Sequence, residues 1–384
     1  MGKLVMPKWP VAEEAEKLAL MKVLNSNTWW RNQGEQVKEF EREFSKYHDV
    51  KYGVGVTNGT VAIEVALKAL GIKAGDEVIV PDFTFFSTVS AVLTINAIPV
   101  LVDVTSDTFC IDPKVVKRAI TEKTKAIIPV HLSGHICDMD TLCALAKEYH
   151  LYMIEDCSHA HGARRSKKMA GSFGDLATFS FQNAKLMTAG EGGIIIGNDL
   201  NLVKKVFLEV NCGREENDTV YNHVLVGTNA RMCEFQGAVL NAQLGRYKQQ
   251  MQLRMKNYEY LSLKMQEIPG IKLQRIEPDI DIHSHYMIMF YYDKEKFGNK
   301  ERNQFIDFLR SKGIPANRSY EALHRLPILK KQSHWKQVSL QGEICQNTER
   351  ISNEVVCIAH NILLGDYDLM DFIVETIWQF KMSS

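Results

Sequence analysis

Two residues five positions apart, Ser180 and Lys185, could together bind and react with a phosphorylated carbonyl compound. An apolar strand ends at Ser180, whose hydroxyl suits a phosphate, and the lysine amine that follows could form a Schiff base. A lone lysine is more often a solvated surface group. The turn at 188–193, Thr-Ala-Gly-Glu-Gly-Gly, shifts this balance because its small residues let the backbone approach closely around the lysine.

A carboxylate follows a second apolar strand, in the segment Ile154-Glu-Asp-Cys-Ser-His159. Ligands of open α/β sheets bind beyond the carboxyl ends of the strands. A carboxylate there can keep a pyridine nitrogen protonated, which maintains pyridoxal 5′-phosphate (PLP) as an electron sink. The alternative is that Asp156 only caps the next turn.

A third segment, Thr57-Asn-Gly-Thr60, opens an apolar helical run at 61–70. The free N–H groups and positive dipole end of a helix suit a phosphate. Taken alone the segment is also an ordinary helix start. Together the three segments and the glycine-rich turn predict a PLP enzyme in which Lys185 binds the cofactor.

The elements that must position these residues alternate along the chain. Apolar strand-like runs are separated by helical patterns, which indicates an α/β fold with a mainly parallel sheet covered on both faces. The predicted strands are 77–81, 99–104, 125–130, 151–156, 177–181 and 193–197, and the predicted helices lie near 60–70, 113–120 and 138–149.

The flanking regions are organised differently. Helical patterns at 11–25 and 34–47 precede the sheet, and a long helical stretch at 234–265 leads out of it. The pattern then restarts after Pro269-Gly270 as a small α+β unit. We expect a large PLP-binding domain over 1–250, including an N-terminal helical segment 1–50, and a smaller C-terminal domain over 251–384.

Composition excludes several classes of protein. Lysine plus arginine and aspartate plus glutamate both number 46 among 384 residues, so no nucleic-acid surface is expected. No apolar run approaches the roughly 20 residues of a membrane span, and no signal peptide is visible, which predicts a cytoplasmic protein. The eight cysteines form no Cys-x-x-Cys pair, so reduced thiols and no metal site are expected. Neither the dinucleotide-binding motif G-x-G-x-x-G nor the phosphate-binding motif G-x-x-x-x-G-K-[ST] occurs, so a nicotinamide or nucleotide enzyme is not expected.

The motifs resemble, in their order along nearly the whole chain, those of the DegT/DnrJ/EryC1/StrS aminotransferases. The resemblance rests on Glu-Asp-Cys-Ser-His-Ala-His-Gly at 155–162, Ser-Phe-x-x-x-Lys at 180–185, Gly-Glu-Gly-Gly at 190–193 and Gly-Thr-Asn-Ala-Arg-Met at 227–232. It implies the type I fold of PLP-dependent aminotransferases: a large domain with a mixed, mainly parallel sheet between helices, and a smaller C-terminal α+β domain.

The resemblance also implies roles for single residues. Lys185 would bind the cofactor aldehyde and later move a proton between substrate and cofactor, and Asp156 would pair with the pyridine nitrogen. The remaining contacts implied within the subunit are the phosphate-binding Gly59, Thr60 and Ser180 and the ring-stacking Phe85.

Two further implied contacts concern the neighbouring subunit and the ring hydroxyl of PLP. Asn229 resembles the family asparagine that reaches the phosphate of the neighbouring subunit, which implies a homodimer with shared active sites. His159 stands where many members have glutamine beside the ring hydroxyl of PLP. A histidine can also hydrogen-bond there, but this departure leaves its contact open.

Within the family, the segments 29–31, 181–193, 284–287 and 360–365 are similar to the 3-amino-5-hydroxybenzoate synthase and cyclitol aminotransferase group. We expect transfer of an amino group from L-glutamate or L-glutamine to a keto-sugar or keto-cyclitol in amino-sugar, aminoglycoside or related biosynthesis. The alternative is a PLP-dependent dehydratase or aromatising lyase like the synthases. A non-catalytic relative is a third reading, which the intact Lys185 argues against.

Five further residues are candidates for substrate contact. Aromatic faces suit ring C–H surfaces, and arginine suits a carboxylate. Each of these residues has an equally plain structural reading. The candidates are Trp30, Arg31, His131, Tyr320 and His324.

Overall fold

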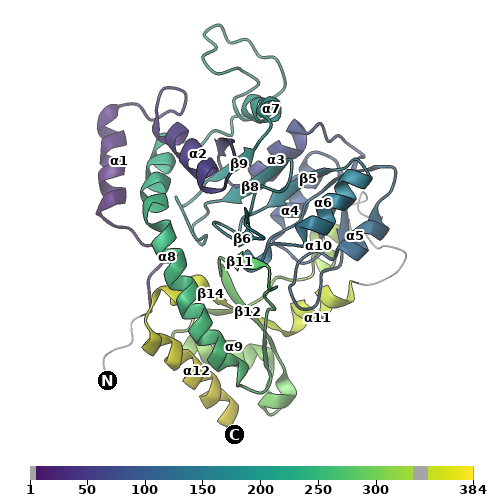
Figure 1. The fold of residues 1–384 in the computed structure, drawn as a ribbon, viewed down its shortest axis with the longest axis vertical. Helices are drawn as coiled ribbons and strands as arrows, with labels where there is room; N and C mark the ends of the chain where they lie inside the picture. Colours follow the sequence, from purple (N-terminus) through teal and green to yellow (C-terminus); the bar gives the residue numbers. More distant parts are fainter. Residues whose placement is uncertain (1–5, 332–344, 384) are drawn as a thin grey trace.

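The computed structural model describes residues 6–331 and 345–383, and its centre is a seven-stranded mixed sheet (Figure 1). Its strand order is β1-β9-β8-β5-β4-β2-β3. β9 runs antiparallel to both of its neighbours, and the other pairings are parallel. The predicted mixed, mainly parallel sheet is therefore confirmed. Its strands are β1 (Tyr52–Val56), β2 (Glu77–Pro81), β3 (Ile98–Val102), β4 (Thr124–Ile127), β5 (Tyr152–Asp156), β8 (Leu176–Ser180) and β9 (Gly193–Gly197).

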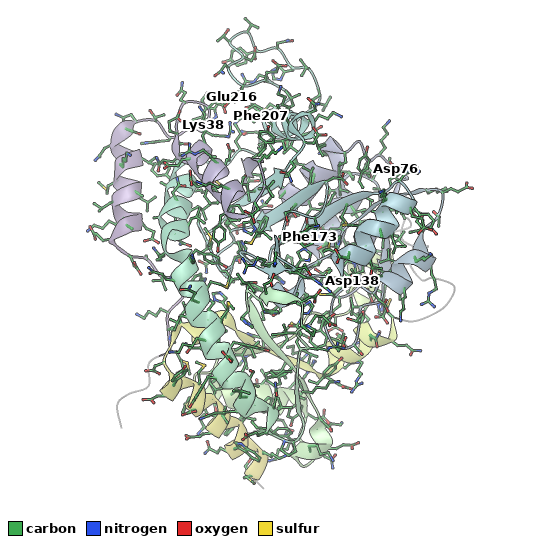
Figure 2. The ribbon with its side chains drawn as sticks, viewed as in Figure 1. Lys38, Asp76, Asp138, Phe173, Phe207 and Glu216 are labelled. Atoms are coloured by element: carbon green, nitrogen blue, oxygen red, sulfur yellow. The ribbon has the colours of Figure 1, made fainter. Side chains whose placement is uncertain are left out.

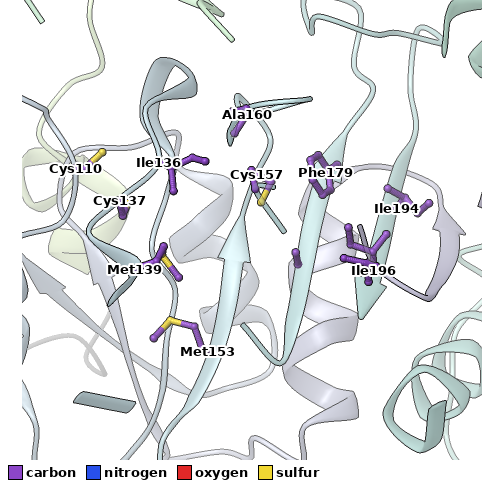
Figure 3. Close-up of a cluster of buried hydrophobic side chains, with 14 of the residues drawn as sticks. Cys110, Ile136, Cys137, Met139, Met153, Cys157, Ala160, Phe179, Ile194 and Ile196 are labelled. Carbon is purple, nitrogen blue, oxygen red and sulfur yellow. The ribbon is translucent and has the colours of Figure 1, made fainter. Parts of the chain in front are cut away.

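Apolar side chains project from both faces of this sheet, so helices must pack against each face. Ile195 of β9 belongs to one core, whereas Ile194 and Ile196 belong to the other. Figure 3 shows part of the second core, where Ile194 and Ile196 lie beside Phe179 of β8. The first core is covered by α3 (Gly59–Ala69), α4 (Ser87–Thr94) and α7 (Leu200–Val210), and the second by α2 (Gln36–Tyr47), α5 (Pro113–Ala119), α6 (Met139–Glu148) and the first part of α8 (Glu234–Gln266).

The long helix α8 joins this layer to a second body (Figure 1). It packs against α1 (Glu14–Ser26) and α2 at one end and against α12 (Tyr367–Met382) at the other. The second body holds an antiparallel sheet of order β10-β12-β14-β13, covered by α9 (Arg302–Ser311) and α12. Its strands are β10 (Ile271–Leu273), β12 (Met287–Tyr292), β13 (Ala316–Arg318) and β14 (Val355–Ala359).

A small third sheet connects distant segments of the chain. It contains β11 (Ile280–Ile282), β6 (Arg164–Arg165) and β7 (Lys168–Met169). Sequence periodicity missed these short strands, and it also missed α4, α7 and α11 (Gln346–Glu354). No helix in the described ranges is long and apolar enough to span a membrane.

Candidate active site

Two neighbouring strands of the central sheet deliver Asp156 and Ser180. β5 ends at Asp156 and β8 at Ser180, and the two strands pair in parallel. Asp156 is 4% exposed, and its Oδ2 accepts a hydrogen bond from Thr88 Oγ1 of α4 at 3.0 Å. Its Oδ1 accepts one from the backbone N–H of Ser158 at 3.1 Å. The carboxylate is thus fixed at the carboxyl edge of the sheet.

The start of α3 lies directly against Ser180. Asn58 caps this helix by accepting a hydrogen bond from the N–H of Val61 at 2.9 Å. A Cβ atom on Gly59 would lie 2.7 Å from Cβ of Ser180, so only glycine fits here. The structure therefore brings Gly59, its neighbour Thr60 and Ser180 together at a helix N-terminus, the arrangement that binds phosphate.

Lys185 follows β8 on a short, braced turn. Gln243 of α8 accepts a hydrogen bond from the N–H of Thr188 at 2.9 Å, and the Thr188 hydroxyl donates to the carbonyl of Phe181. The Nζ of Lys185 lies 4.5 Å from the ring centre of Tyr286. Burial lowers the pKa of Lys185 to about 8, against the opposing pull of the Asp156 charge. A useful fraction of this amine is therefore neutral and nucleophilic near pH 7.

His159 occupies the wall beside Lys185. Its ring stacks on Tyr286 with centroids 4.2 Å apart, and its Nε2 lies 3.2 Å from the hydroxyl of Tyr320. Burial, with a further contribution from the Lys185 charge, holds the pKa of His159 well below its ordinary value. Tyr320 in turn lies 6.2 Å, ring to ring, from Phe85, which is 58% exposed.

Neighbouring contacts thus gather seven of the predicted site residues at one edge of the sheet. The sequence model of the DegT/DnrJ/EryC1/StrS aminotransferase family matches residues 10–377. The chain belongs to this family. It is a PLP-dependent enzyme of the aminotransferase family, as the motifs predicted. The gathered residues are Gly59, Thr60, Phe85, Asp156, His159, Ser180 and Lys185.

Individual family members align over almost the full chain. The 3-amino-5-hydroxybenzoate synthase of Amycolatopsis mediterranei is 38% identical over 94% of this chain and 93% of its own length. The L-glutamine:2-deoxy-scyllo-inosose aminotransferase of Streptoalloteichus tenebrarius is 32% identical over 97% and 93%. The crystal structure of a 3-amino-5-hydroxybenzoic acid synthase superposes with a TM-score of 0.91 at 37% identity, covering 98% of both chains.

The gathered residues fit PLP in this family member. The space beside Gly59 that a Cβ would close lies next to the Ser180 hydroxyl, as a phosphate cradle requires. Asp156 offers a buried carboxylate to a pyridinium nitrogen, and Lys185 offers an amine of lowered pKa. Bound there, the cofactor would supply the electron sink for proton removal at the substrate carbon.

Two predicted substrate residues have ring nitrogens that are already engaged. Nε2 of His131 lies 3.0 Å from Glu155, and its Nδ1 accepts from the N–H of Cys137. Both nitrogens of His324 face carboxylates, those of Asp82 at 2.5 Å and Glu349 at 2.7 Å. In this conformation neither histidine has a free nitrogen for a substrate.

Ligand atoms of His131, Glu155 and Cys157 cluster within 4.8 Å, which raises the question of a metal. The carboxylate of Glu155 already accepts three backbone hydrogen bonds, from Gly171, Phe173 and Gly174, at 2.8 to 2.9 Å. Its fourth partner is His131. Glu155 and His131 therefore form a hydrogen-bonded brace for the loop 171–174.

The structure places Arg31 away from Lys185. Its Nε and Nη2 donate to both oxygens of Glu41 at 3.0 and 2.8 Å, and its guanidinium lies over Phe207. It lines a pocket of about 560 Å³ between α2, β1 and α7, near the labelled Lys38, Phe207 and Glu216 of Figure 2. None of the residues around Lys185 lines this pocket. Trp30 lies nearby, under the guanidinium of Arg231.

Asn229 is exposed, and its neighbour Ala230 accepts a hydrogen bond from the N–H of Thr57, just before α3, at 2.9 Å. Asn229 forms a β-bridge with Asn211 at the base of a protruding loop (Figure 1, beside α7).

Sequence reasoning also missed contributors to the site. Thr88 and Ser133 carried no signal of their own, whereas Tyr286 lay in the family-like segment 284–287 without receiving a role.

Proposed function

We propose that this enzyme transfers the amino group of L-glutamine or L-glutamate to a keto-cyclitol or keto-sugar. The observation that carries the PLP chemistry of this proposal is the buried Lys185 amine, whose pKa is lowered, together with the fixed carboxylate of Asp156. The relatives named as L-glutamine:2-deoxy-scyllo-inosose aminotransferases support the donor and the ring-shaped acceptor. The aromatic side chains of Tyr286, His159 and Tyr320 lie beside Lys185, and aromatic rings suit the C–H surface of a ring-shaped acceptor.

Each residue has a role in this proposal. Lys185 binds the cofactor and, once displaced by substrate, holds the migrating proton at Nζ. Asp156 pairs with the pyridine nitrogen, while Thr88 keeps that carboxylate in place. Gly59 and Ser180 hold the phosphate. The product of the acceptor is an amino-cyclitol or amino-sugar of the kind used in aminoglycoside biosynthesis.

A second candidate is the reaction of a 3-amino-5-hydroxybenzoate synthase, an aromatising loss of water. The 38% identity to that synthase of Amycolatopsis mediterranei favours it. It would use the same lysine and cofactor, and it would differ from transamination in needing no amino donor.

One spectroscopic experiment separates the two. The purified protein with PLP should absorb at about 410–420 nm, the region of a lysine-bound cofactor, and Lys185→Ala should not. In the wild type, L-glutamine or L-glutamate should convert this band to one at about 330 nm, and a keto-cyclitol should restore it. A stable band that no amino acid converts would favour the lyase, and the absence of any band would refute both candidates.

We also propose that the enzyme is a homodimer with shared active sites. The loop above α7 exposes four apolar side chains, and one of them, Val226, is 97% exposed. Several exposed apolar side chains gathered on one loop are typical of a surface that binds another protein. The four are Val220, Tyr221, Val224 and Val226.

Mixing two inactive variants tests site sharing. Lys185→Ala and Asn229→Ala subunits, unfolded and refolded together, should recover about a quarter of wild-type activity, because about half of the dimers are mixed and each mixed dimer holds one intact site of its two. No recovery from a mixture shown to contain mixed dimers would refute a shared site.

A further inference from the structure

The imidazole of His159 has no nitrogen left for the cofactor. Its Nδ1 accepts a hydrogen bond from the backbone N–H of Ser133 at 3.3 Å, and its Nε2 lies 3.2 Å from the hydroxyl of Tyr320. The ring also lies nearly parallel to two aromatic rings, that of Tyr286 at 4.2 Å and that of Tyr320 at 6.1 Å between centroids. The contact that family likeness assigns to this position, beside the PLP ring hydroxyl, is therefore blocked at both nitrogens.

The contact with Ser133 decides which nitrogen carries the proton. A nitrogen that accepts a backbone N–H is unprotonated, so the neutral imidazole carries its proton on Nε2. That proton points at Tyr320, whose oxygen accepts it. The phenol proton of Tyr320 is then free to donate to a third group.

Ser133 itself is held firmly. Its φ of 60° is in the left-handed region, and its carbonyl accepts a hydrogen bond from the N–H of Tyr286 at 2.9 Å. Its hydroxyl donates to the carbonyl of Met287 at 2.5 Å. Strand β12 of the second body thus fixes Ser133, and through it the tautomer of His159.

The surroundings of Tyr320 keep its hydroxyl a donor and place it in the site. Burial, reinforced by Tyr286, raises the pKa of Tyr320 well above its ordinary value, and the charge of Asp156 acts in the same direction. Its ring lies 6.2 Å from Phe85, the residue predicted to stack on the cofactor. Tyr320 therefore stays protonated and lies next to both His159 and Phe85.

We propose that Tyr320 donates its hydroxyl proton to the ring oxygen of bound PLP, and that His159 is a positioning residue acting through Tyr320. The inference rests on the proposed use of PLP at Lys185. In family members with glutamine at this position, the side-chain amide would make the contact itself. Here the chain His159–Tyr320 replaces that single residue.

A double-mutant cycle on the holoenzyme tests the proposal. The variants are Tyr320→Phe, which removes only the donor, and His159→Asn, whose side-chain oxygen can replace Nδ1 toward Ser133 but cannot reach Tyr320. The third is the double variant. Tyr292→Phe serves as the control, because the Tyr292 hydroxyl donates to the carbonyl of Lys300 within the second body. Two quantities are measured: the PLP dissociation constant of the apoprotein, and the pH midpoint of the visible band.

The donor stabilises the anionic ring oxygen, which otherwise holds the neighbouring imine proton more tightly. Tyr320→Phe should therefore weaken PLP binding about tenfold and raise the pH midpoint by about one unit. His159→Asn should shift both quantities in the same direction by less. In the Tyr320→Phe background it should add almost nothing, because its effect passes through the missing hydroxyl.

Additive effects of the two substitutions would overturn the proposal and return the contact to His159. An unchanged midpoint in Tyr320→Phe would also overturn it, provided that the wild type shows the band. A wild type without any band is a different failure, that of the proposed function. Fluorescence melting of each apoprotein checks that the variants are folded.

Discussion

The pKa of Lys185 gives the most direct test of the site, because it can be measured in the apoprotein before any reaction is known. Burial lowers this pKa from 10.5 to about 8. At pH 7 the neutral fraction of the amine is then about 9%, compared with about 0.03% for an ordinary lysine. The site therefore raises the concentration of the nucleophile about 300-fold.

Competitive labelling with trace acetic anhydride, followed by peptide mass spectrometry, measures this pKa residue by residue. The acetylation rate of Lys185 should rise with a midpoint near pH 8 and then level off. Lys294 serves as an internal reference in the same digest, since its hydrogen bond to Glu301 raises its pKa. The two lysines should thus depart from the ordinary value in opposite directions.

Asp156→Asn tests the direction in which the Asp156 charge shifts the pKa of Lys185. The Asp156 charge opposes the effect of burial, so its removal should lower the pKa of Lys185 further and move the midpoint below pH 8. A wild-type midpoint near 10.5 would refute the argument that burial activates this lysine. A midpoint that rises in Asp156→Asn would refute the electrostatic coupling between the two residues.

Four further outcomes follow from particular contacts. Gly59→Ala should weaken PLP binding in an equilibrium titration by more than about tenfold, because its Cβ would lie 2.7 Å from Ser180 Cβ, whereas Gly245→Ala on open α8 surface should leave binding intact and stabilise the helix by about 0.5–1 kcal/mol. Thr88→Val should destabilise the apoprotein by about 1–3 kcal/mol in urea unfolding by leaving Asp156 Oδ2 without its donor, while Thr88→Ser should be milder. Arg31→Met should lower the free energy of unfolding by about 3–5 kcal/mol in the same assay, because it leaves the buried Glu41 carboxylate without its partner. Adding Glu41→Gln should recover most of that loss. A changed acceptor KM with unchanged stability would instead support a substrate role for Arg31. Val224→Lys with Val226→Lys should shift sedimentation toward the monomer, and Leu263→Lys, an exposed apolar position on α8, should not.

The sheet was largely predictable from sequence because its strands are buried on both faces and read as continuous apolar runs. The runs at 77–81 and 193–197 coincide with β2 and β9. Strand ends were less accurate where the apolar run outlasts the strand: the runs predicted at 99–104 and 125–130 extend beyond β3 and β4, which end at Val102 and Ile127. Short strands such as β6 and β7 have two residues each and no periodicity to detect.

The candidate site contains residues whose position the local sequence predicts and residues whose position it does not. Asp156, Ser180 and Lys185 could be foreseen because each follows a strand whose end the apolar pattern locates. Arg31 could not be placed, because a lone arginine reads the same whether it faces a substrate or pairs with a carboxylate ten residues away. The same limit applies across the domains, since His159 and Tyr320 lie 161 residues apart and meet only after α8 has positioned the second body. The residues proposed to bind PLP are thus placed by local sequence, whereas the residues proposed to orient them depend on how the two bodies pack. A substitution in the second body, at Tyr320 or at β12 beneath Ser133, should therefore alter the chemistry of a cofactor bound to the first.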